Sequence, residues 1–343
     1  MNSSMDSIDS RTDYGVVYKK NIGSYLVHVN GEVIACHTST RLRRQLIYPT
    51  ADPHSLRPVV QKVIVNDDVD PIAIGDEVRF VRAVDGSGLI VEVLPRRTRM
   101  ARKTAVPMPG ANPFEQVIVA NLDQVVPVFA AVNPTPKWPL LDRYLVSAES
   151  AELSALICIT KMDLLPESGS GAEELSQAVE DYRSIGYRVL LTSVVTGQGI
   201  DELKQALGGR TSVLLGKSGV GKTSLLNTLQ PGLGLRVSEV SRATGKGRHT
   251  TSHLEMFSIR FDGSSQAGAI VDTPGVREFG MWNVDGADLA LYFPEMRPLV
   301  GKCKFGLDCR HDSEPGCAIR QAVTSGRINS NRYQSYLRMQ AES

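Results

Sequence analysis

The sequence predicts a multidomain α/β protein with a small β-barrel: an N-terminal OB-fold, an α/β domain with a mostly parallel sheet, and a C-terminal metal-binding helical segment. Three observations predict this fold class. Short alternating apolar runs fill the first part of the chain, strand and helix patterns then alternate around a glycine-rich loop, and cysteines crowd near the end. We place the three domains at residues 1–105, 106–295 and 296–343.

Composition excludes several classes of protein. With 38 Lys+Arg against 37 Asp+Glu, the chain has no uniformly basic nucleic-acid coat, although a basic patch remains compatible with this balance. No apolar run approaches a membrane span, and the Ser- and Asp-rich start lacks the apolar core of a signal peptide. We therefore expect a cytoplasmic protein with no membrane partner, and we also expect a monomer.

The first domain is predicted from short strand patterns. Residues 24–29 alternate, Asn30-Gly31 is a hairpin turn pair, and residues 32–36 return. Further runs at 59–65, 77–84 and 89–94 bring the total to about five strands, which favours a closed OB barrel. The polar residues before Thr12 predict a disordered start. The basic run at 95–103 is interpreted as a linker between domains, which is either simply solvated or, as its place beside an OB barrel favours, in contact with RNA phosphates.

The second domain is predicted from alternating strands and helices. Strand patterns occur at 116–120, 125–132, 155–159 and 187–192, and helix patterns at 140–150, 172–185 and 200–207. This alternation predicts a parallel sheet covered on both faces.

A phosphate-binding loop is the strongest motif of the chain. Residues 216–223 fit the pattern G-x-x-x-x-G-K-[ST], between a short apolar strand and a helix start. Glycines let the backbone N–H groups face phosphates, Lys222 reaches the outer phosphates, and the Thr223 hydroxyl ligates Mg²⁺. The predicted nucleotide-binding residues of this loop are Gly216, Lys217, Ser218, Gly219, Val220, Gly221, Lys222, Thr223 and Ser224.

A second motif predicts which base is bound. Thr160-Lys161-Met162-Asp163 fits the pattern [NT]-K-x-D that reads guanine in GTPases. The Asp163 carboxylate accepts from guanine N1–H and the exocyclic amine, and the Lys161 stem lies along the purine face. Ser193 is assigned to a second base-contacting loop, although Val194 follows where GTPases usually carry Ala. The expected ligands are therefore GTP and GDP.

The remaining nucleotide motifs follow the phosphate loop. Asp272 begins a D-x-P-G sequence in which it holds Mg²⁺ through a water, while the Gly275 amide faces the terminal phosphate. In the polar loop at 243–252, either Thr250 or Thr251 completes the Mg²⁺ shell.

Hydrolysis without a partner is predicted to be slow. Val276 stands where many GTPases place a water-orienting Gln, and an aliphatic side chain cannot polarise water. His249 is the nearest candidate for positioning the water. The alternative is a histidine that only packs or stays solvated.

The order of these motifs is unusual. In standard GTPases the phosphate loop comes first and [NT]-K-x-D follows D-x-P-G, whereas here the base-reading motif precedes the phosphate loop. A circular permutation produces this order and is tolerated because chain ends lie close together on domain surfaces. The second switch then leads directly into the C-terminal segment, so we expect phosphate-linked movement to reach that segment.

The C-terminal segment carries a predicted zinc site. Cys303, Cys309, His311 and Cys317 supply three thiolates and one imidazole, which form a tetrahedral set for one Zn²⁺ per chain. The chain has 5 cysteines, and this clustering favours metal binding in a reducing compartment over disulfides. A helix at 318–325 and a tail with three arginines, Arg327, Arg332 and Arg338, are expected to follow.

Together these motifs resemble the circularly permuted, ribosome small-subunit-dependent GTPases called RsgA (YjeQ). The resemblance covers the chain from Tyr14 and includes L-P-R-R at 94–97, G-R-H-T-T at 247–251, D-T-P-G-V-R-E-F at 272–279 and the C-x5-C-x-H-x5-C cluster. It implies GTP hydrolysis stimulated by the small ribosomal subunit, a role in late subunit maturation, contact with its ribosomal RNA through the barrel and zinc domains, a bound zinc ion, and action of His249 in hydrolysis. Two other functions are compatible with parts of the pattern: a P-loop ATPase or kinase, and a non-catalytic RNA-binding module with a structural nucleotide.

Overall fold

The structure is a computed structural model that describes residues 12–40, 42, 72–103, 115–233, 254–261, 267–272, 284 and 286–342. The chain divides into two compact units. One comprises Met1–Asn121 with Leu254–Met256, and the other comprises Leu122–His253 with Phe257–Ser343. Among the described residues, no helix combines the length and the apolar character needed to cross a bilayer. The predicted disordered start, the predicted strand at 59–65 and the predicted switch loop at 243–252 lie outside the described residues.

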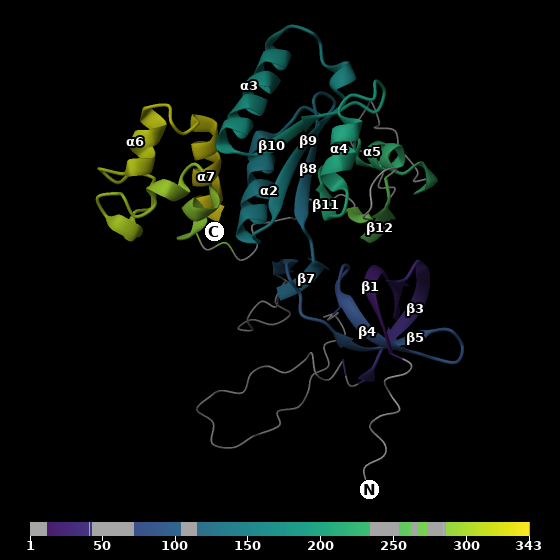
Figure 1. Cartoon of the computed structure of the whole chain (residues 1–343). Helices are drawn as coiled ribbons and strands as arrows, with labels where there is room; N and C mark the ends of the chain where they lie inside the picture. Colours follow the sequence, from purple (N-terminus) through teal and green to yellow (C-terminus); the bar gives the residue numbers. More distant parts are fainter. Residues whose placement is uncertain are drawn as a thin grey trace, which may run out of the picture. The chain divides into compact units, whose positions relative to one another are not determined.

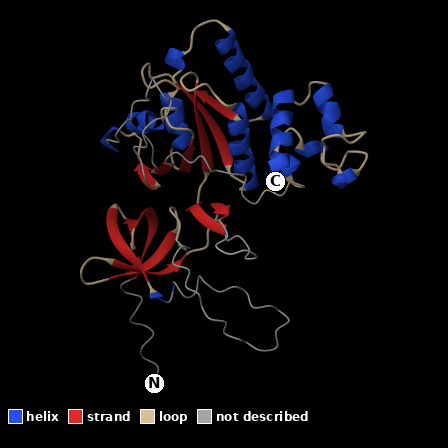
Figure 2. Ribbon diagram, turned by 180° about the vertical axis from the view of Figure 1, so that it is seen from behind, coloured by secondary structure: helices blue, strands red, loops and turns tan. Residues whose placement is uncertain are grey.

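The first unit contains a closed β-barrel, whose strands curl around one another in Figure 2. β1 pairs antiparallel with both β2 and β4, β2 pairs with β3, and β5 closes the ring between β3 and β4. The pairing of β3 with β5 is parallel. This arrangement confirms the predicted OB-like barrel. The strands are β1 (Thr12–Asn21), β2 (Ser24–Val29), β3 (Glu32–Thr38), β4 (Glu77–Arg82) and β5 (Gly88–Val93).

The barrel interior is filled by alternate residues of its strands. Val27, Cys36 and Phe80 are fully buried, as period-2 alternation requires on the inner face. Gly88 lies where strands approach closely, because a Cβ there would be 2.4 Å from Cys36 Sγ. The hairpin turn predicted at Asn30-Gly31 has both residues at positive φ, as type I′ turns need.

The basic run at 95–103 differs from its predicted form. Its second half forms β6 (Arg99–Lys103), which pairs antiparallel with β7 (Glu115–Ala120). Arg96 donates through Nε and Nη2 to the fully buried carboxylate of Asp76, at 2.6 and 2.7 Å. The strand predicted at 116–120 therefore lies outside the parallel sheet and belongs to the first unit. An alternating run predicts a strand but leaves the partner strand undefined, which explains the difference.

The second unit is built on a mostly parallel sheet, as predicted. Its strand order is β10-β9-β8-β11-β13-β12, and the pairs from β10 through β13 are all parallel. Helices α2 (Trp138–Ser150) and α3 (Ser170–Ile185) lie on one face, and α4 (Ile200–Leu207) and α5 (Lys222–Leu229) on the other (Figure 1). The strands are β8 (Gln124–Ala130), β9 (Ser154–Thr160), β10 (Arg188–Leu191), β11 (Thr211–Leu215), β12 (Glu255–Ile259) and β13 (Gly268–Asp272).

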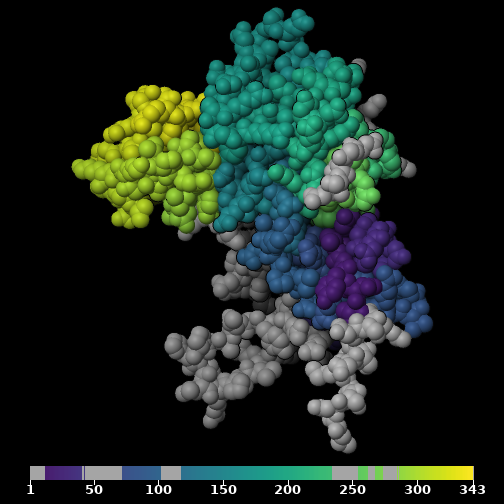
Figure 3. Space-filling view, in the orientation of Figure 1, coloured from purple at the N-terminus to yellow at the C-terminus, as the bar shows by residue number. Residues whose placement is uncertain are grey.

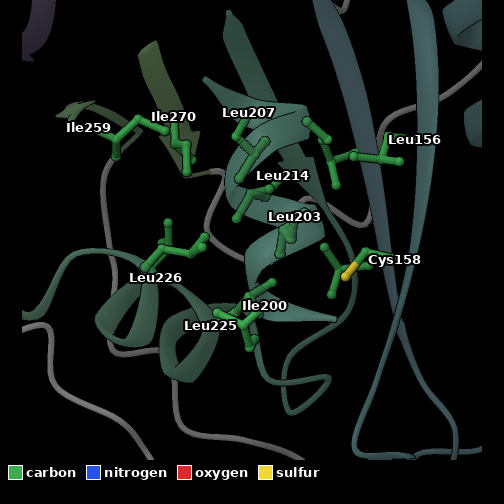
Figure 4. Packing of buried hydrophobic residues seen from close by; sticks show 14 of the residues in the cluster. Leu156, Cys158, Ile200, Leu203, Leu207, Leu214, Leu225, Leu226, Ile259 and Ile270 are labelled. Atoms are coloured by element: carbon green, nitrogen blue, oxygen red, sulfur yellow. The ribbon is translucent and has the colours of Figure 1, made fainter. Parts of the chain in front are cut away.

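Apolar packing fixes the helix that follows the phosphate loop. Figure 4 shows Leu225 and Leu226 of α5 beside α4 and the sheet, in a cluster that includes Leu203 and Leu214. These four leucines are essentially inaccessible to solvent. Burying one leucine side chain stabilises the fold by roughly 1.5–3 kcal/mol, so α5 presents its N-terminus from a firmly held position.

The C-terminal segment packs on a helix that covers the parallel sheet. It contains short 3₁₀ turns and two helices, α6 (Ala318–Thr324) and α7 (Ser330–Glu342). Phe293, Tyr336 and Met339 form a core that includes Val146 of α2, and Figure 3 shows this yellow segment lying directly against the teal helices. Most of the predicted tail with three arginines forms α7, and one of these arginines, Arg332, is 3% exposed. The predicted domain boundary at residue 295 stays a prediction.

Candidate functional site

The phosphate loop lies between β11 and α5, where the motif places it. Gly219 and Gly221 adopt positive φ values of 85° and 96°, which side chains disfavour. A Cβ on Gly216 would lie 2.4 Å from the carbonyl oxygen of Val128, so the loop passes tightly over β8. Gly221 is the N-cap of α5. The free N–H groups of the first turn and the helix dipole therefore favour an anion at this end.

Lys222 is buried at the centre of the loop. Its Nζ donates to the carbonyl oxygens of Gly216 and Lys217, at 2.6 and 3.1 Å. Burial lowers the pKa of Lys222, and the nearby Asp272 carboxylate raises it in part. Asp272 ends β13 and pairs with Leu214 in the neighbouring strand, so this carboxylate lies beside the start of the loop and is 3% exposed.

The base-reading motif contacts the phosphate loop directly. Lys161, at φ 59°, donates from Nζ to the carbonyl oxygen of Gly219 at 2.7 Å. The Thr160 hydroxyl donates to the carbonyl oxygen of Val220 at 2.5 Å. Two motifs separated by more than fifty residues therefore meet at one edge of the sheet. Burial lowers the pKa of Lys161, and Asp163 raises it in part.

Ser193 orients the carboxylate of Asp163, the predicted base-reading residue. Its hydroxyl donates to Asp163 Oδ1 at 2.5 Å and accepts from the N–H groups of Val195 and Thr196, both at 3.2 Å. The hydroxyl's own orientation is thus fixed by the backbone of the following turn. A carboxylate fixed in this way can accept two parallel hydrogen bonds from a base edge.

Other predicted residues fall outside the described part of the chain. These are His249, Thr250, Thr251 and Gly275. Their roles in positioning water, completing the Mg²⁺ shell and facing the terminal phosphate stay predictions.

The four predicted zinc ligands converge. One ligand atom from each of Cys303, Cys309, His311 and Cys317 lies within 4.8 Å of the others, and all four residues are buried. His311 Nδ1 is 3.4 Å from the Cys303 sulfur and 3.5 Å from the Cys317 sulfur. Three sulfurs and one imidazole nitrogen at this spacing fit the donor set of a tetrahedral Zn²⁺ site.

Backbone groups support this cluster. The N–H of Ala318 donates to the Cys303 sulfur at 3.3 Å, and the N–H of Arg320 donates to the Cys317 sulfur at 3.4 Å. Both amides belong to the first turn of α6, so the helix N-terminus favours thiolate character at these sulfurs. From α7, the Tyr333 hydroxyl donates to the carbonyl oxygen of His311 at 2.6 Å.

Sequence analysis missed two features: one contributor to the candidate nucleotide site, and the burial of an arginine that it had named. The carbonyl oxygen of Asn133, in the loop after β8, accepts a hydrogen bond from Lys161 Nζ. The second is Arg332, whose guanidinium is buried against Asp142 and Glu295. Neither residue belongs to a motif. The apolar spacing of Tyr333, Tyr336 and Met339 was a signal that could have placed Arg332 on a packed helix.

Comparisons with known proteins agree with this geometry. A family model described as RsgA GTPase matches residues 93–282. A protein of Gemmatimonas aurantiaca named small ribosomal subunit biogenesis GTPase RsgA is 43% identical over 274 residues, covering 79% of this chain and 84% of the relative. A protein of the same name from Geobacillus thermodenitrificans is 37% identical and covers 96% of both chains.

Solved structures give the same result. The crystal structure of YjeQ from Thermotoga maritima matches with a TM-score of 0.69 and 30% identity, covering 96% of this chain and 98% of that one. The crystal structure of YloQ, described as a circularly permuted GTPase, matches with a TM-score of 0.65 and 29% identity, covering 99% and 97%. These matches confirm the permuted order of motifs inferred from the sequence. The chain therefore belongs to the RsgA GTPase family.

Proposed function

We propose that this chain binds GTP with Mg²⁺, hydrolyses it to GDP and phosphate, and does so fastest on the small ribosomal subunit during its late maturation. The observation that carries the proposal is the direct contact of Thr160 and Lys161 with Val220 and Gly219. This contact joins a base-reading strand end to a phosphate loop in one site.

The phosphate side of the site fits a triphosphate. Lys222 supplies a buried ammonium, and the backbone amides before α5 supply donors to the phosphate oxygens. The Thr223 hydroxyl and the Asp272 carboxylate are the oxygen ligands that would hold Mg²⁺, directly and through a water. When bound, the ion neutralises charge that develops on the phosphate oxygens.

The base side of the site fits guanine. Ser193 holds Asp163 so that both carboxylate oxygens can face guanine N1–H and the exocyclic amine. Adenine presents an acceptor at N1 and has no amine at C2, so it leaves this carboxylate unpaired, which disfavours the ATPase or kinase alternative.

We assign the water-positioning role to His249 and the last Mg²⁺ ligand to Thr250 or Thr251. We assign one Zn²⁺ to Cys303, Cys309, His311 and Cys317. The relatives' names support the small subunit as partner. We propose that the barrel and the zinc segment contact its ribosomal RNA, and that the protein acts in the cytoplasm as a monomer.

GTP turnover with and without purified small subunits tests the function. We expect slow release of phosphate from the protein alone and a large increase when subunits are added. The matched variants are Lys222→Ala, which should lose both rates, and Lys204→Ala on α4, which should keep both. Equal rates with and without subunits would contradict the proposed partner, while turnover of ATP as fast as GTP would contradict the base assignment.

A further inference from the structure

A buried polar network joins the C-terminal segment to the helices of the nucleotide-binding sheet. Arg332 of α7 donates from Nη1 to Asp142 Oδ1 at 2.7 Å and from Nε to Glu295 Oε1 at 2.8 Å. The Tyr182 hydroxyl of α3 donates to the same Asp142 oxygen at 2.7 Å. The side chains of Arg332 and Asp142 are 4% and 3% exposed. The guanidinium also lies over the Phe293 ring, 4.6 Å from its centroid.

This network includes α2 and α3, the two helices that follow β8 and β9 in the chain. α2 starts five residues after Asn133, whose carbonyl oxygen accepts from Lys161 Nζ. Trp138, the first residue of α2, packs against the Tyr182 ring with centroids 5.9 Å apart. α3 is the next helix of the chain after the turn that holds Asp163. The start of α2 thus lies near the acceptor of Lys161, and the last turn of α3 packs against this same part of α2 through Tyr182, which contacts both Trp138 and Asp142.

The same α7 helix is tied to the metal cluster. Tyr333 and Tyr336 follow Arg332 on this helix. Their hydroxyls donate to the carbonyl oxygens of His311 and Arg310, at 2.6 and 2.9 Å. Peripheral pairs add to the docking: Asn329 donates to Asp181 of α3 at 2.6 Å, and Arg297 pairs with Glu149 of α2 at 2.6 Å. A continuous set of contacts therefore runs from the cysteine cluster through α7 to α2 and α3.

We propose that Arg332 is a positioning residue for the guanine site: it fixes α2 and α3 against the metal-bearing segment, so that occupancy of the metal cluster and affinity for the guanine base are coupled. The inference rests on the proposed function, because it assumes that Asp163 and Lys161 read the base. The C-terminal segment then holds α2 and α3 in the positions that the base-reading residues need. Because Arg332 touches neither base nor phosphate, it acts only through Asp142 and Tyr182.

The test is a thermodynamic cycle on the full chain. The dissociation constant for GDP is measured for the zinc-loaded and the chelator-stripped protein, each as wild type and as Arg332→Met. We expect stripping the metal to raise the wild-type dissociation constant by about 5-fold or more, the lower end of coupling between sites. We expect Arg332→Met to raise it by a similar factor, and stripping the metal from this variant to add less than about 2-fold, because the coupling is already lost.

Two further variants complete the design. Arg338→Met removes an exposed arginine from the same helix and should behave as wild type. Asp142→Asn keeps the shape of the buried site and should reproduce Arg332→Met, and it carries the cycle if the arginine variant does not fold. For both network variants, turnover at saturating GTP should stay within about 2-fold of wild type, so that the effect appears in KM and leaves kcat unchanged.

The possible outcomes distinguish failure of the proposed role of Arg332 from failure of the proposed GTPase function. GDP affinity that is unchanged in both Arg332→Met and Asp142→Asn, while hydrogen exchange in α7 increases, would reduce Arg332 to a purely structural role. Additive effects of metal loss and Arg332→Met would also overturn the coupling. A wild-type, zinc-loaded chain that binds ADP as tightly as GDP would instead contradict the proposed function.

Discussion

The candidate nucleotide site and the cysteine cluster differ in exposure and in how they are held: Asp163, Lys217 and Ser218 are exposed, whereas the four cluster residues are buried. The nucleotide site is assembled from strand ends between Thr160 and Asp272, and its parts are joined mainly by hydrogen bonds to backbone carbonyl groups. The cluster lies within residues 303–317 and brings four ligand side chains within 4.8 Å of one another. Contacts between distant segments therefore shape the first site, whereas the second gathers, within one short segment, four groups whose donor set fits a metal cation.

This difference has an energetic consequence. Three thiolates in close proximity repel one another unless a metal neutralises them, so we expect a bound metal to contribute directly to folding of the segment. A phosphate loop fixed by glycine geometry and by Lys161 keeps its shape through the surrounding sheet and helices. We therefore expect loss of the metal to lower mainly the folding stability of the cysteine cluster. Removal of a side chain from the phosphate loop should lower mainly the rate of GTP hydrolysis.

Loss of the metal should give the largest effect. Cys317→Ser removes a ligand that also accepts from the Arg320 N–H at the start of α6. We expect the variant to lose its zinc and much of the associated free energy of folding, which is about 10–16 kcal/mol for isolated zinc-finger peptides. Metal content by mass spectrometry and hydrogen exchange in α6 and α7 measure this. Cys158→Ala, in β9, is the control and should retain one ion; equal protection of α7 in both variants would refute the dependence on metal.

Lys222→Ala should affect chemistry without destabilising the fold. We expect GTP turnover to fall by about 10²–10³-fold, the effect of removing one donor to transition-state charge. Burial already lowers the pKa of this ammonium, so its removal relieves a desolvation cost. The free energy of unfolding in denaturant should therefore stay equal or rise. A marked loss of stability would show that Lys222 helps to hold the phosphate loop in place. The loop would then resemble the cysteine cluster, where we expect loss of the metal to lower folding stability.

Asp163→Asn should change the base that is bound. The amide nitrogen of Asn opposes guanine N1–H but can donate to the C2 carbonyl of xanthine. We expect GTP affinity to fall by about 10²-fold, as two charge-assisted hydrogen bonds are lost, and affinity for xanthosine triphosphate to rise. Competition binding with the three triphosphates GTP, XTP and ATP measures the switch. Equal weakening of all three would indicate a folding defect in place of altered base reading.

Ser193→Ala should give the smallest effect. The variant loses one hydrogen bond to Asp163, worth about 1 kcal/mol, so the dissociation constant for GDP should rise by about 5-fold. Ser184→Ala, in an exposed position on α3, is the matched control. Because Asp163 itself remains, guanine should still be preferred over xanthine. An unchanged dissociation constant would mean that the backbone alone orients the carboxylate.

Features that depend on neighbours along the chain could be predicted from the residues alone. The phosphate loop, T-K-x-D and the cysteine cluster are short patterns in which residue type and spacing encode the chemistry. The barrel and the parallel sheet followed from period-2 and period-3.6 alternation, because each element must bury one face. The circular permutation could also be predicted, because the base-reading motif precedes the phosphate loop in the sequence.

Contacts between groups far apart in the chain became known from the folded structure. The carbonyl oxygen of Asn133 accepts a hydrogen bond from Lys161. Strand β6 of the basic run pairs with β7, and Arg332 is buried beside Asp142. None of these pairs has a sequence signature, because backbone carbonyls are identical at every position and an arginine carries the same charge whether solvated or buried. Their partners are selected by packing of elements that lie far apart in the chain, and that packing exists only once the chain has folded.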